Sequence, residues 1–348
     1  MSKRFYVLLF LGVLFGLILG FILIRSNKTT DLNKEFVQLP VPQDFNSRTW
    51  KDIRFKKNGI SEGFISSLHM RISQNNYVFV ADNNEKVINQ FNLDGKLKQS
   101  FGKGEGRGPG EFLGIIDIMI DQSGNIWGLD DRNNTVTVFD VNDSENFEVL
   151  NFPEVFNRVI PAGNNSYWLE RKFDNQMKKY SLSGEYLGDA EAIVETPTLW
   201  SFVLESYAAL TLDGSVIQSQ YHTNLFLKYS KEGKILFFRE PIEFLGYPKI
   251  DPYYANEVGK MNTVDFTSWK QITRNPQVVN NTIQLFVHQK VGNSDNWRKG
   301  FMDVYSLENG DYLYSYELPE RLESVAISSD YLAGISEELG KVVVWKYQ

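Results

Sequence analysis

A repeated hairpin pattern constrains the fold of this chain more than any other feature. Six turn-like segments, rich in Asn, Asp, Gly and Ser, each precede an extended apolar or aromatic run, which is typical of β-hairpins. The six runs begin at Tyr77, Ile126, Tyr167, Val216, Ile283 and Tyr331. A further aromatic residue follows each start, after 13 or 14 residues in five copies and after 22 in the fifth copy along the chain. The sequence therefore predicts six copies of one structural unit.

A second turn follows the aromatic residue in most copies. Examples are the glycine-containing segments "NLDGKL", "SLSGEYL" and "SKEGKIL". Four short antiparallel strands, here called a to d, recurring at roughly 40 to 50 residues are the signature of a β-propeller blade. We therefore predict an all-β fold, a six-bladed β-propeller of four-stranded antiparallel blades.

The two ends of the repeat region fit this ring. The sixth copy stops at "KVVVWKYQ", which is its strand c, so that the blade lacks an outer strand. An open sheet edge would expose unpaired backbone groups. Residues 49–57, "TWKDIRFKK", look like a strand that belongs to no other unit. We expect this N-terminal strand to close the sixth blade, which places the propeller at residues 49–348.

Residues 1–30 differ from the rest and predict a membrane anchor, followed by a linker over residues 31–48. Phe5 to Ile24 is an uncharged, mostly apolar run, long enough for one transmembrane helix. A cleaved signal peptide is the alternative, because it shares the basic start and apolar run. Lys3 and Arg4 favour a cytoplasmic N-terminus, although Arg25 lies on the far side. The propeller is therefore expected on the periplasmic or extracellular side.

Composition excludes several classes of site. The chain has no cysteine, which rules out disulfides, thiolate metal sites and a cysteine nucleophile. The net charge is −7, and the first thirty residues carry only basic charges, so the predicted propeller is acidic. An acidic body disfavours nucleic acid as a partner.

The segment "FGKGEGRGPGEF", residues 101–112, raises the question of a phosphate-binding loop. No register of its glycines matches G-x-G-x-x-G, and Lys103 is followed by glycine rather than by Ser or Thr, so neither nucleotide motif is present. Glycine also permits the close backbone approach that a crossing between blades requires. We predict that the segment links blade 1 to blade 2, with Phe101 and Phe112 buried at its ends. Arg107 is either a solvated charge or a binding residue.

This segment and the following "IDIMIDQSGNIWGLDDRNNTVTVFD" resemble the NHL repeat, and the chain is similar to NHL and TolB-like six-bladed propellers. The resemblance is best over residues 65–150, and the later copies keep the spacing without the motif. It implies a fold often found in exported or membrane-anchored bacterial proteins. It also implies an Asp near the end of strand b, for which Asp82 and Asp131 are the candidates, more as acceptors for backbone amides than as catalytic acids.

One face of the predicted propeller collects the irregular loops. The b–c turns and the d-to-a connections share this face, and both long insertions, residues 241–269 and 289–300, fall there. Loops on a rigid scaffold are where binding groups are usually displayed. We predict that this face binds a peptide, glycan or protein, unless its aromatic residues only pack the insertions onto the blades. The candidate binding residues are Arg107, Asp82, Asp131, His222, His288, Tyr253, Tyr254, Trp269 and Trp297.

An enzyme is the alternative interpretation. Lactonase-type and amidating-lyase-type propellers, which this chain resembles in fold, place acidic, Asn or His ligands around the central channel. Here the inner strands offer His69, Asp117 and Asn157, which makes His69 and Asp117 candidate ligands for Ca²⁺ or Zn²⁺. No complete ligand set aligns, and neither G-x-S-x-G nor H-E-x-x-H occurs. We therefore predict a binding module without a cofactor, with a metal-dependent hydrolase or lyase as the alternative.

Overall fold

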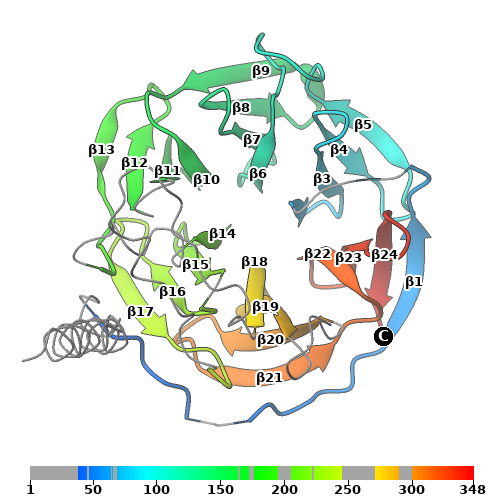
Figure 1. Ribbon diagram of the computed structural model, residues 1–348, viewed down its shortest axis with the longest axis vertical. Helices are drawn as coiled ribbons and strands as arrows, with labels where there is room; N and C mark the ends of the chain where they lie inside the picture. Colours follow the sequence, from blue (N-terminus) through cyan, green and yellow to red (C-terminus); the bar gives the residue numbers. More distant parts are fainter. Residues whose placement is uncertain are drawn as a thin grey trace, which may run out of the picture.

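The computed structural model describes residues 38–44, 47–63, 65, 69–163, 165–171, 176–194, 205–221, 223–244, 271–289 and 300–348. Within these residues, strands form six sheets of four strands, and every pairing inside a sheet is antiparallel. Figure 1 shows the sheets arranged in a ring around a central axis, with strand a of each blade innermost. The predicted six-bladed propeller is confirmed.

Blades 1 to 5 each use four consecutive strands. Blade 1 contains β2 (Met70–Ile72), β3 (Val78–Asp82), β4 (Val87–Phe91) and β5 (Leu97–Phe101). Blade 2 contains β6 (Ile115–Ile120), β7 (Ile126–Asp130), β8 (Thr135–Asp140) and β9 (Asp143–Asn151). Blade 3 contains β10 (Phe156–Gly163), β11 (Ser166–Arg171), β12 (Met177–Ser181) and β13 (Tyr186–Asp189). Blade 4 contains β14 (Ser206–Leu210), β15 (Val216–Gln220), β16 (Phe226–Tyr229) and β17 (Ile235–Arg239). Blade 5 contains β18 (Gln271–Val279), β19 (Thr282–Gln289), β20 (Phe301–Ser306) and β21 (Tyr312–Glu317).

Blade 6 combines the two ends of the propeller. It contains β22 (Leu322–Ile327), β23 (Tyr331–Ser336) and β24 (Val342–Tyr347), and its outer strand is β1 (Phe55–Ile60). β1 pairs antiparallel with β24, so the predicted closure by an N-terminal strand is confirmed. The strand lies later than the expected 49–57, because the chain around Trp50 instead forms a bridge with Ser315 of blade 5.

The core lies between neighbouring blades. Each blade packs both of its faces against other blades, so the strand b segments are buried on both sides, as in β3, where all five residues are buried. Aromatic rings join the blades in pairs. The rings of Phe101 in blade 1 and Phe139 in blade 2 are 5.7 Å apart, and those of Phe226 in blade 4 and Tyr305 in blade 5 are 4.5 Å apart. Such contacts stabilise the blade-to-blade packing beyond simple burial.

Residues 38–44 and 47–54, here called the N-terminal strap, lie along the outer edges of blades 4 and 5. Val41 forms a bridge with Arg239 of β17, and Trp50 forms one with Ser315 of β21. These residues include part of the predicted linker 31–48. The strap reaches β1 of blade 6 only after it has contacted blade 4 and then blade 5 (Figure 1).

Arg48 attaches the strap to blade 5 through its side chain. Its side chain is only 3% exposed, and its Nε and Nη2 atoms donate to the buried Asp303 carboxylate at 2.9 and 3.0 Å. Nη1 also donates to Glu243, and the guanidinium lies 4.5 Å from the ring centre of Phe301. Removal of either partner from such a buried bidentate pair would leave the charge of the other poorly compensated, which lowers stability.

Two glycines form the joint where the ring closes. A β-carbon at Gly59 of β1 would lie 2.2 Å from the backbone carbon of Asp94, and one at Gly95 would lie 2.4 Å from the carbonyl oxygen of Ile60. Both contacts involve backbone, which cannot move aside as a side chain can. β1 of blade 6 and the c–d turn of blade 1 therefore approach more closely than any other residue type permits.

Gly59→Ala is expected to lower the free energy of unfolding by about 1–3 kcal/mol, near the upper end for overpacking, because β1 must move away from blade 1. Gly63→Ala is the matched control, since a β-carbon at Gly63 meets nothing within 4 Å. Urea unfolding of both variants measures the difference. Equal stabilities would mean that the closing joint is looser than described.

The predicted anchor, residues 1–30 with the helix near 5–24, lies outside the described residues. Among the residues that the structure does describe, no helix is long and apolar enough to cross a bilayer.

Candidate functional site on the propeller axis

The inner strands bring a set of polar side chains to the propeller axis at one level. In blades 2, 3 and 6 a β-bulge lies immediately before this position, which Asp117, Arg158 and Ser324 occupy. His69 takes the equivalent place in blade 1, where its carbonyl accepts a bond from the amide of Ala81. Bulges redirect side chains at such sites. The predicted alignment of His69 with Asp117 agrees with this geometry.

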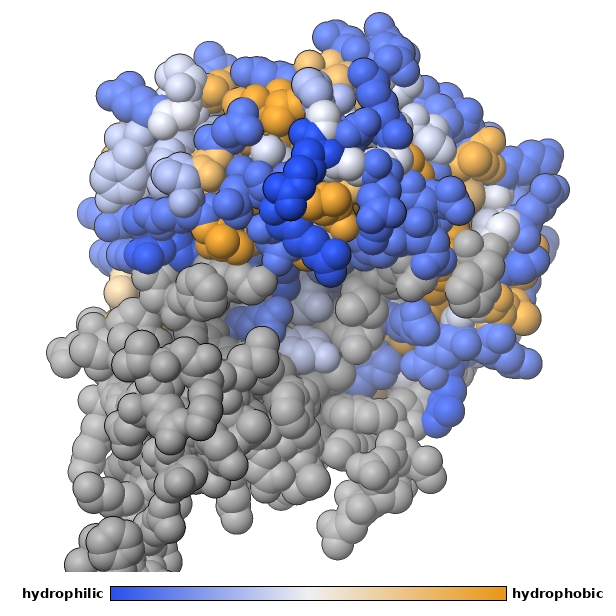
Figure 2. Space-filling model, turned by 45° about the horizontal axis from the view of Figure 1, so that its top comes forward, coloured by the Kyte–Doolittle hydropathy of each residue, from blue (hydrophilic) through white to orange (hydrophobic). Residues whose placement is uncertain are grey.

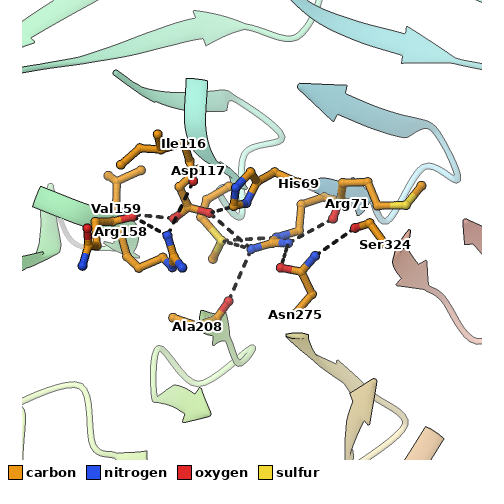
Figure 3. A network of polar contacts seen from close by, with 12 residues as sticks. His69, Arg71, Ile116, Asp117, Arg158, Val159, Ala208, Asn275 and Ser324 are labelled. Carbon is orange, nitrogen blue, oxygen red and sulfur yellow. Dashed lines mark hydrogen bonds and ion pairs between the residues drawn. The ribbon is translucent and has the colours of Figure 1, made fainter. Parts of the chain in front are cut away.

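Asp117 lies between two arginines (Figure 3). Its Oδ1 atom is 3.6 Å from Nη2 of Arg71 and 3.9 Å from Nδ1 of His69, while Oδ2 accepts the amide of Val159 at 3.2 Å. The carboxylate is almost fully buried. Burial raises the pKa of Asp117, whereas Arg158 and Arg71 act in the opposite direction.

Arg71 reaches across the axis from β2 (Figure 3). Its Nη1 atom donates to the carbonyl of Met70 at 3.0 Å and to Oδ1 of Asn275 at 3.3 Å. Its Nη2 atom donates to the carbonyl of Ala208 at 3.4 Å. Nε and Nη2 both contact the sulfur of Met119, at 3.4 and 3.3 Å. One guanidinium thus joins blades 1, 2, 4 and 5.

Arg158 of β10 also contacts backbone carbonyl groups near the propeller axis. Nε donates to the carbonyl of Ser206 and Nη1 to that of Asn157, both at 2.6 Å. The guanidinium lies 4.3 Å from the ring centre of Tyr207, and Nη2 is 4.0 Å from the Glu205 carboxylate. Asn157 therefore contributes its backbone carbonyl to this network.

The pKa directions of the two arginines differ. Burial lowers the pKa of Arg71 below its ordinary value, although Asp117 opposes the shift. Burial also disfavours the charged form of Arg158, but Asp117 and other acidic groups raise the pKa of Arg158 overall. Arg71 is thus the less fully compensated of the two buried cations.

This geometry does not suit the metal ion that the lactonase-like and lyase-like alternative requires. The charge of Asp117 is balanced by two guanidinium groups, which would repel a divalent cation at the same carboxylate. Among the described residues, no group of three or more His, Asp or Glu side chains is arranged to hold a metal. No chemical step is therefore assigned to a metal at His69 and Asp117.

A second buried acid lies beside this network. Glu170 of β11 is fully buried, and its Oε2 atom accepts a bond from the hydroxyl of Ser206 at 2.7 Å. Burial raises the pKa of Glu170 to about 8, although Arg158 opposes this shift. At neutral pH the folded protein therefore holds Glu170 largely in its neutral form.

The glycine-rich segment links blade 1 to blade 2, as predicted. It lies against the b–c turn of blade 2, since Asn133 donates to the carbonyl of Gly106 at 3.1 Å. Just after the segment, the amide of Ile115 at the start of β6 donates to Asn83 in the b–c turn of blade 1 at 3.1 Å. Phe101 and Phe112 are both fully buried, as expected. The segment therefore lies on the predicted face, and Arg107 is exposed there.

The structure corrects the predicted equivalence of Asp82 in blade 1 with Asp131 in blade 2. Asp82 ends β3, and its Oδ1 accepts the amides of Asn84 and Glu85 at 2.9 and 3.4 Å. The equivalent residue is Asp130, which ends β7 and accepts the amides of Arg132 and Asn133 at 2.9 and 3.1 Å. Asp131 lies one residue beyond. β3 begins one residue after Tyr77, whereas β7 begins at Ile126 itself, and this offset displaced the alignment.

Asp130 also fixes the glycine-rich segment, because its Oδ2 accepts the amide of Leu113 at 2.6 Å. Asp82 and Asp130 thus hold turns in place, as expected for acceptors of backbone amides.

The other predicted site residues lie apart or outside. His288 is buried near the end of β19, with its ring centre 4.4 Å from that of Phe286. The remaining candidates lie outside the described residues: His222, Tyr253, Tyr254, Trp269 and Trp297.

Sequence reasoning missed the two arginines and Glu170. Arg71 follows His69 by two residues on an inner strand, and this alternation could have indicated that both face the axis. Arg158 was not distinguishable from Asn157, because the bulge before Arg158 changes which side chain turns inward.

Comparisons with known proteins address the fold. A family model described as a 6-bladed beta-propeller, DUF5128, matches residues 61–191. A search of curated proteins gives no significant match.

Solved structures with the same architecture share little sequence. A Bacteroides fragilis protein described as exported is 12% identical, with 89% of this chain and 98% of that chain covered and a TM-score of 0.60. A DUF4221 family member from Bacteroides vulgatus is 8% identical, with coverages of 86% and 99% and a TM-score of 0.57. Virginiamycin B lyase from Staphylococcus aureus is 11% identical, with coverages of 85% and 99% and a TM-score of 0.50. Together with the sheet topology, these similarities identify the chain as a six-bladed β-propeller.

Proposed function

We propose that the protein is a membrane-tethered β-propeller on the periplasmic or extracellular side, which binds a protein, peptide or glycan. The binding surface is the face that carries the b–c turns and the d-to-a connections, here called the b–c face. The apolar run of residues 5–24 supports the tether, and the basic residues before it support the orientation. The b–c face carries the glycine-rich segment, and both long insertions are predicted from the sequence to lie on it.

The observation that carries this proposal is the state of Asp117. An enzyme of the lactonase or lyase type would need reactive or metal-binding groups on the propeller axis. The carboxylate found there is enclosed between Arg71 and Arg158 and accepts a backbone amide. These contacts tie the inner strands of several blades together, which suits a rigid display scaffold.

The b–c face offers contacts of the kind that binding surfaces use. Arg107 is exposed on a segment that Asp130 and Asn133 fix to the blade. An exposed arginine on a fixed backbone loses little conformational entropy when it binds. Figure 2 shows one side of the molecule, on which hydrophilic residues predominate among the described residues and hydrophobic residues are scattered.

A site-specific photocrosslink tests the binding face. A photoreactive amino acid is placed at Arg107, or at Gln74 on the opposite face as the matched control, in the full-length protein in native membranes. We expect a crosslinked partner from position 107 and none from position 74. Crosslinks from position 74 alone would place the binding surface on the face opposite the b–c face and contradict the proposal.

Two further measurements test the remaining parts of the proposal. Protease added to intact spheroplasts is expected to digest the propeller, and protection would overturn the orientation. Metal analysis of the purified full-length protein tests the enzyme alternative. Stoichiometric calcium or zinc that is lost in His69→Ala would contradict a binding module without a metal.

A further inference from the structure

A cavity of about 540 Å³ opens on the face opposite the glycine-rich segment. The a–b turns and the adjoining parts of strand a from five blades form it, and we call it the a–b cavity. Its size lies within the usual range for small-molecule sites, roughly 300 to 1,000 Å³. Because this cavity lies outside the b–c face, a ligand site in it is independent of the proposed function.

The lining of the a–b cavity has two parts. Aliphatic residues, most of them half-buried against the hydrophobic clusters between blades, form much of the wall, and uncharged amides and hydroxyls form the rim. The wall contains Ile72, Ile120, Leu210, Val278 and Ile327, and the rim contains Asn75, Gln122, Ser123, Asn280 and Ser329. Such a surface suits a ligand with an aliphatic stem.

Arg71 and Met119 form the floor. Both line the cavity, and both also belong to the network that crosses the propeller axis, so they lie at the inner end of the cavity. The Arg71 side chain is 9% exposed. A buried cation at the end of an aliphatic pocket is the arrangement that recognises a carboxylate.

The other charged residue of the lining is Asp121, and its carboxylate is already used. Oδ1 accepts the amides of Ser123 and Asn125, both at 2.9 Å. Oδ2 accepts the side chains of Asn125 and Trp127 at 3.0 and 3.1 Å. These four bonds hold the Asp121 carboxylate in the turn between β6 and β7, so that Arg71 is the charged residue of the floor.

The contact between Arg71 and Met119 points to what the cavity binds. Nε and Nη2 form the edge of a guanidinium that pairs with a carboxylate through two parallel bonds. In Arg71 both atoms instead meet a thioether sulfur, at 3.4 and 3.3 Å. A thioether is a weak acceptor, so the strongest recognition edge of Arg71 has a weak protein partner.

The nearby acids do not compensate Arg71 fully. Asp117 is 3.6 Å from Nη2, beyond hydrogen-bond distance, and it also faces Arg158. Arg158 has a second acid, Glu205, at 4.0 Å. Two buried cations thus share one buried carboxylate, and the cation with fewer acidic neighbours is the one at the cavity floor.

We propose that the a–b cavity binds a small aliphatic monocarboxylate. Its carboxylate accepts two bonds from Nε and Nη2 of Arg71 in place of the Met119 sulfur, and its stem packs along the aliphatic wall. No covalent bond is made or broken, and no further component is required.

Isothermal titration calorimetry of the full-length protein with octanoate tests this proposal, with octan-1-ol as the matched ligand that lacks the charge. We expect octanoate to bind at least tenfold more tightly than octanol, because hydrogen bonds between a guanidinium and a carboxylate are stronger than those to a neutral hydroxyl. Equal affinities, or no octanoate binding at millimolar concentration, would overturn the proposal.

Two variants change the affinity in opposite directions. Arg71→Met is expected to reduce octanoate affinity at least tenfold while octanol binding stays unchanged. Met119→Leu keeps the apolar wall but frees the guanidinium edge, and it is expected to tighten octanoate binding several-fold. Met119→Leu keeps the test decisive if Arg71→Met fails to fold. Weaker octanoate binding by a folded Met119→Leu protein would contradict the exchange of sulfur for carboxylate.

Discussion

Arg48→Ala is expected to lower the free energy of unfolding by about 3–5 kcal/mol, because removal of one partner leaves a buried charge uncompensated. The Asp303 carboxylate is fully buried and accepts two bonds from Arg48 and one from the hydroxyl of Ser315, the last at 2.5 Å. Burial raises the pKa of Asp303, and Arg48 opposes this shift. Without the guanidinium, the folded protein must either bury a bare charge or take up a proton.

Urea unfolding at pH 7 measures this loss. Arg54→Ala is the matched control, because Arg54 is exposed in the same segment and its backbone carbonyl accepts the amide of Gln348. Its stability is expected to stay within about 0.5 kcal/mol of the wild type. The double variant Arg48→Met with Asp303→Leu is expected to recover at least half of the loss, since apolar residues can replace a buried pair. A loss below about 1 kcal/mol in Arg48→Ala would mean that the strap is held by other contacts.

Glu170 is expected to make the protein less stable as the pH rises from about 4.5 to about 8. Its ordinary pKa is 4.5, and burial raises the value in the folded protein to about 8. Below pH 4.5 both the folded and the unfolded chain hold the proton, so the stabilisation is fully present. Between these values the unfolded chain loses its proton while the folded chain keeps it, and the stabilisation is lost by about pH 8.

The size of this effect follows from the shift. Each pKa unit corresponds to about 1.4 kcal/mol, so Glu170 contributes on the order of 4 kcal/mol across this window. Glu170→Gln carries no titrating proton and is expected to be less pH-dependent than the wild type by this amount. Unfolding of both proteins at pH 5 and pH 8 measures the difference, with the exposed Glu232→Gln as control. Parallel curves for Glu170→Gln and the wild type would show that Glu170 is ionised in the folded protein.

The number of blades was predictable because it depends on local signals that recur. A turn, an apolar run and an aromatic residue mark strands b and c in each copy, and the missing outer strand of blade 6 required a partner from elsewhere in the chain. Strand boundaries were less predictable. Trp50 reads as part of a strand, but its ring packs on Phe301 of blade 5, at 5.5 Å between ring centres, and only tertiary packing decides this.

The axial network was predictable only in part. His69 and Asp117 were found because their blades share the clearest repeat. Arg71 and Arg158 come from different blades, and their contact with one carboxylate depends on how six sheets meet at the axis. Glu170 looks like an ordinary strand residue in sequence, and its pKa shift depends on complete burial against blade 4. Such properties arise from assembly rather than from any single repeat.

The course of the strap determines how the fold bears a mechanical load. A pull on the chain ahead of residue 38 first loads the bridge at Val41 on blade 4, then the Arg48 pair, and then the bridge at Trp50 on blade 5. The β1–β24 pairing that closes the ring comes last in this series. Tension applied from the N-terminal side would therefore have to detach the strap from two blades before it could open the ring.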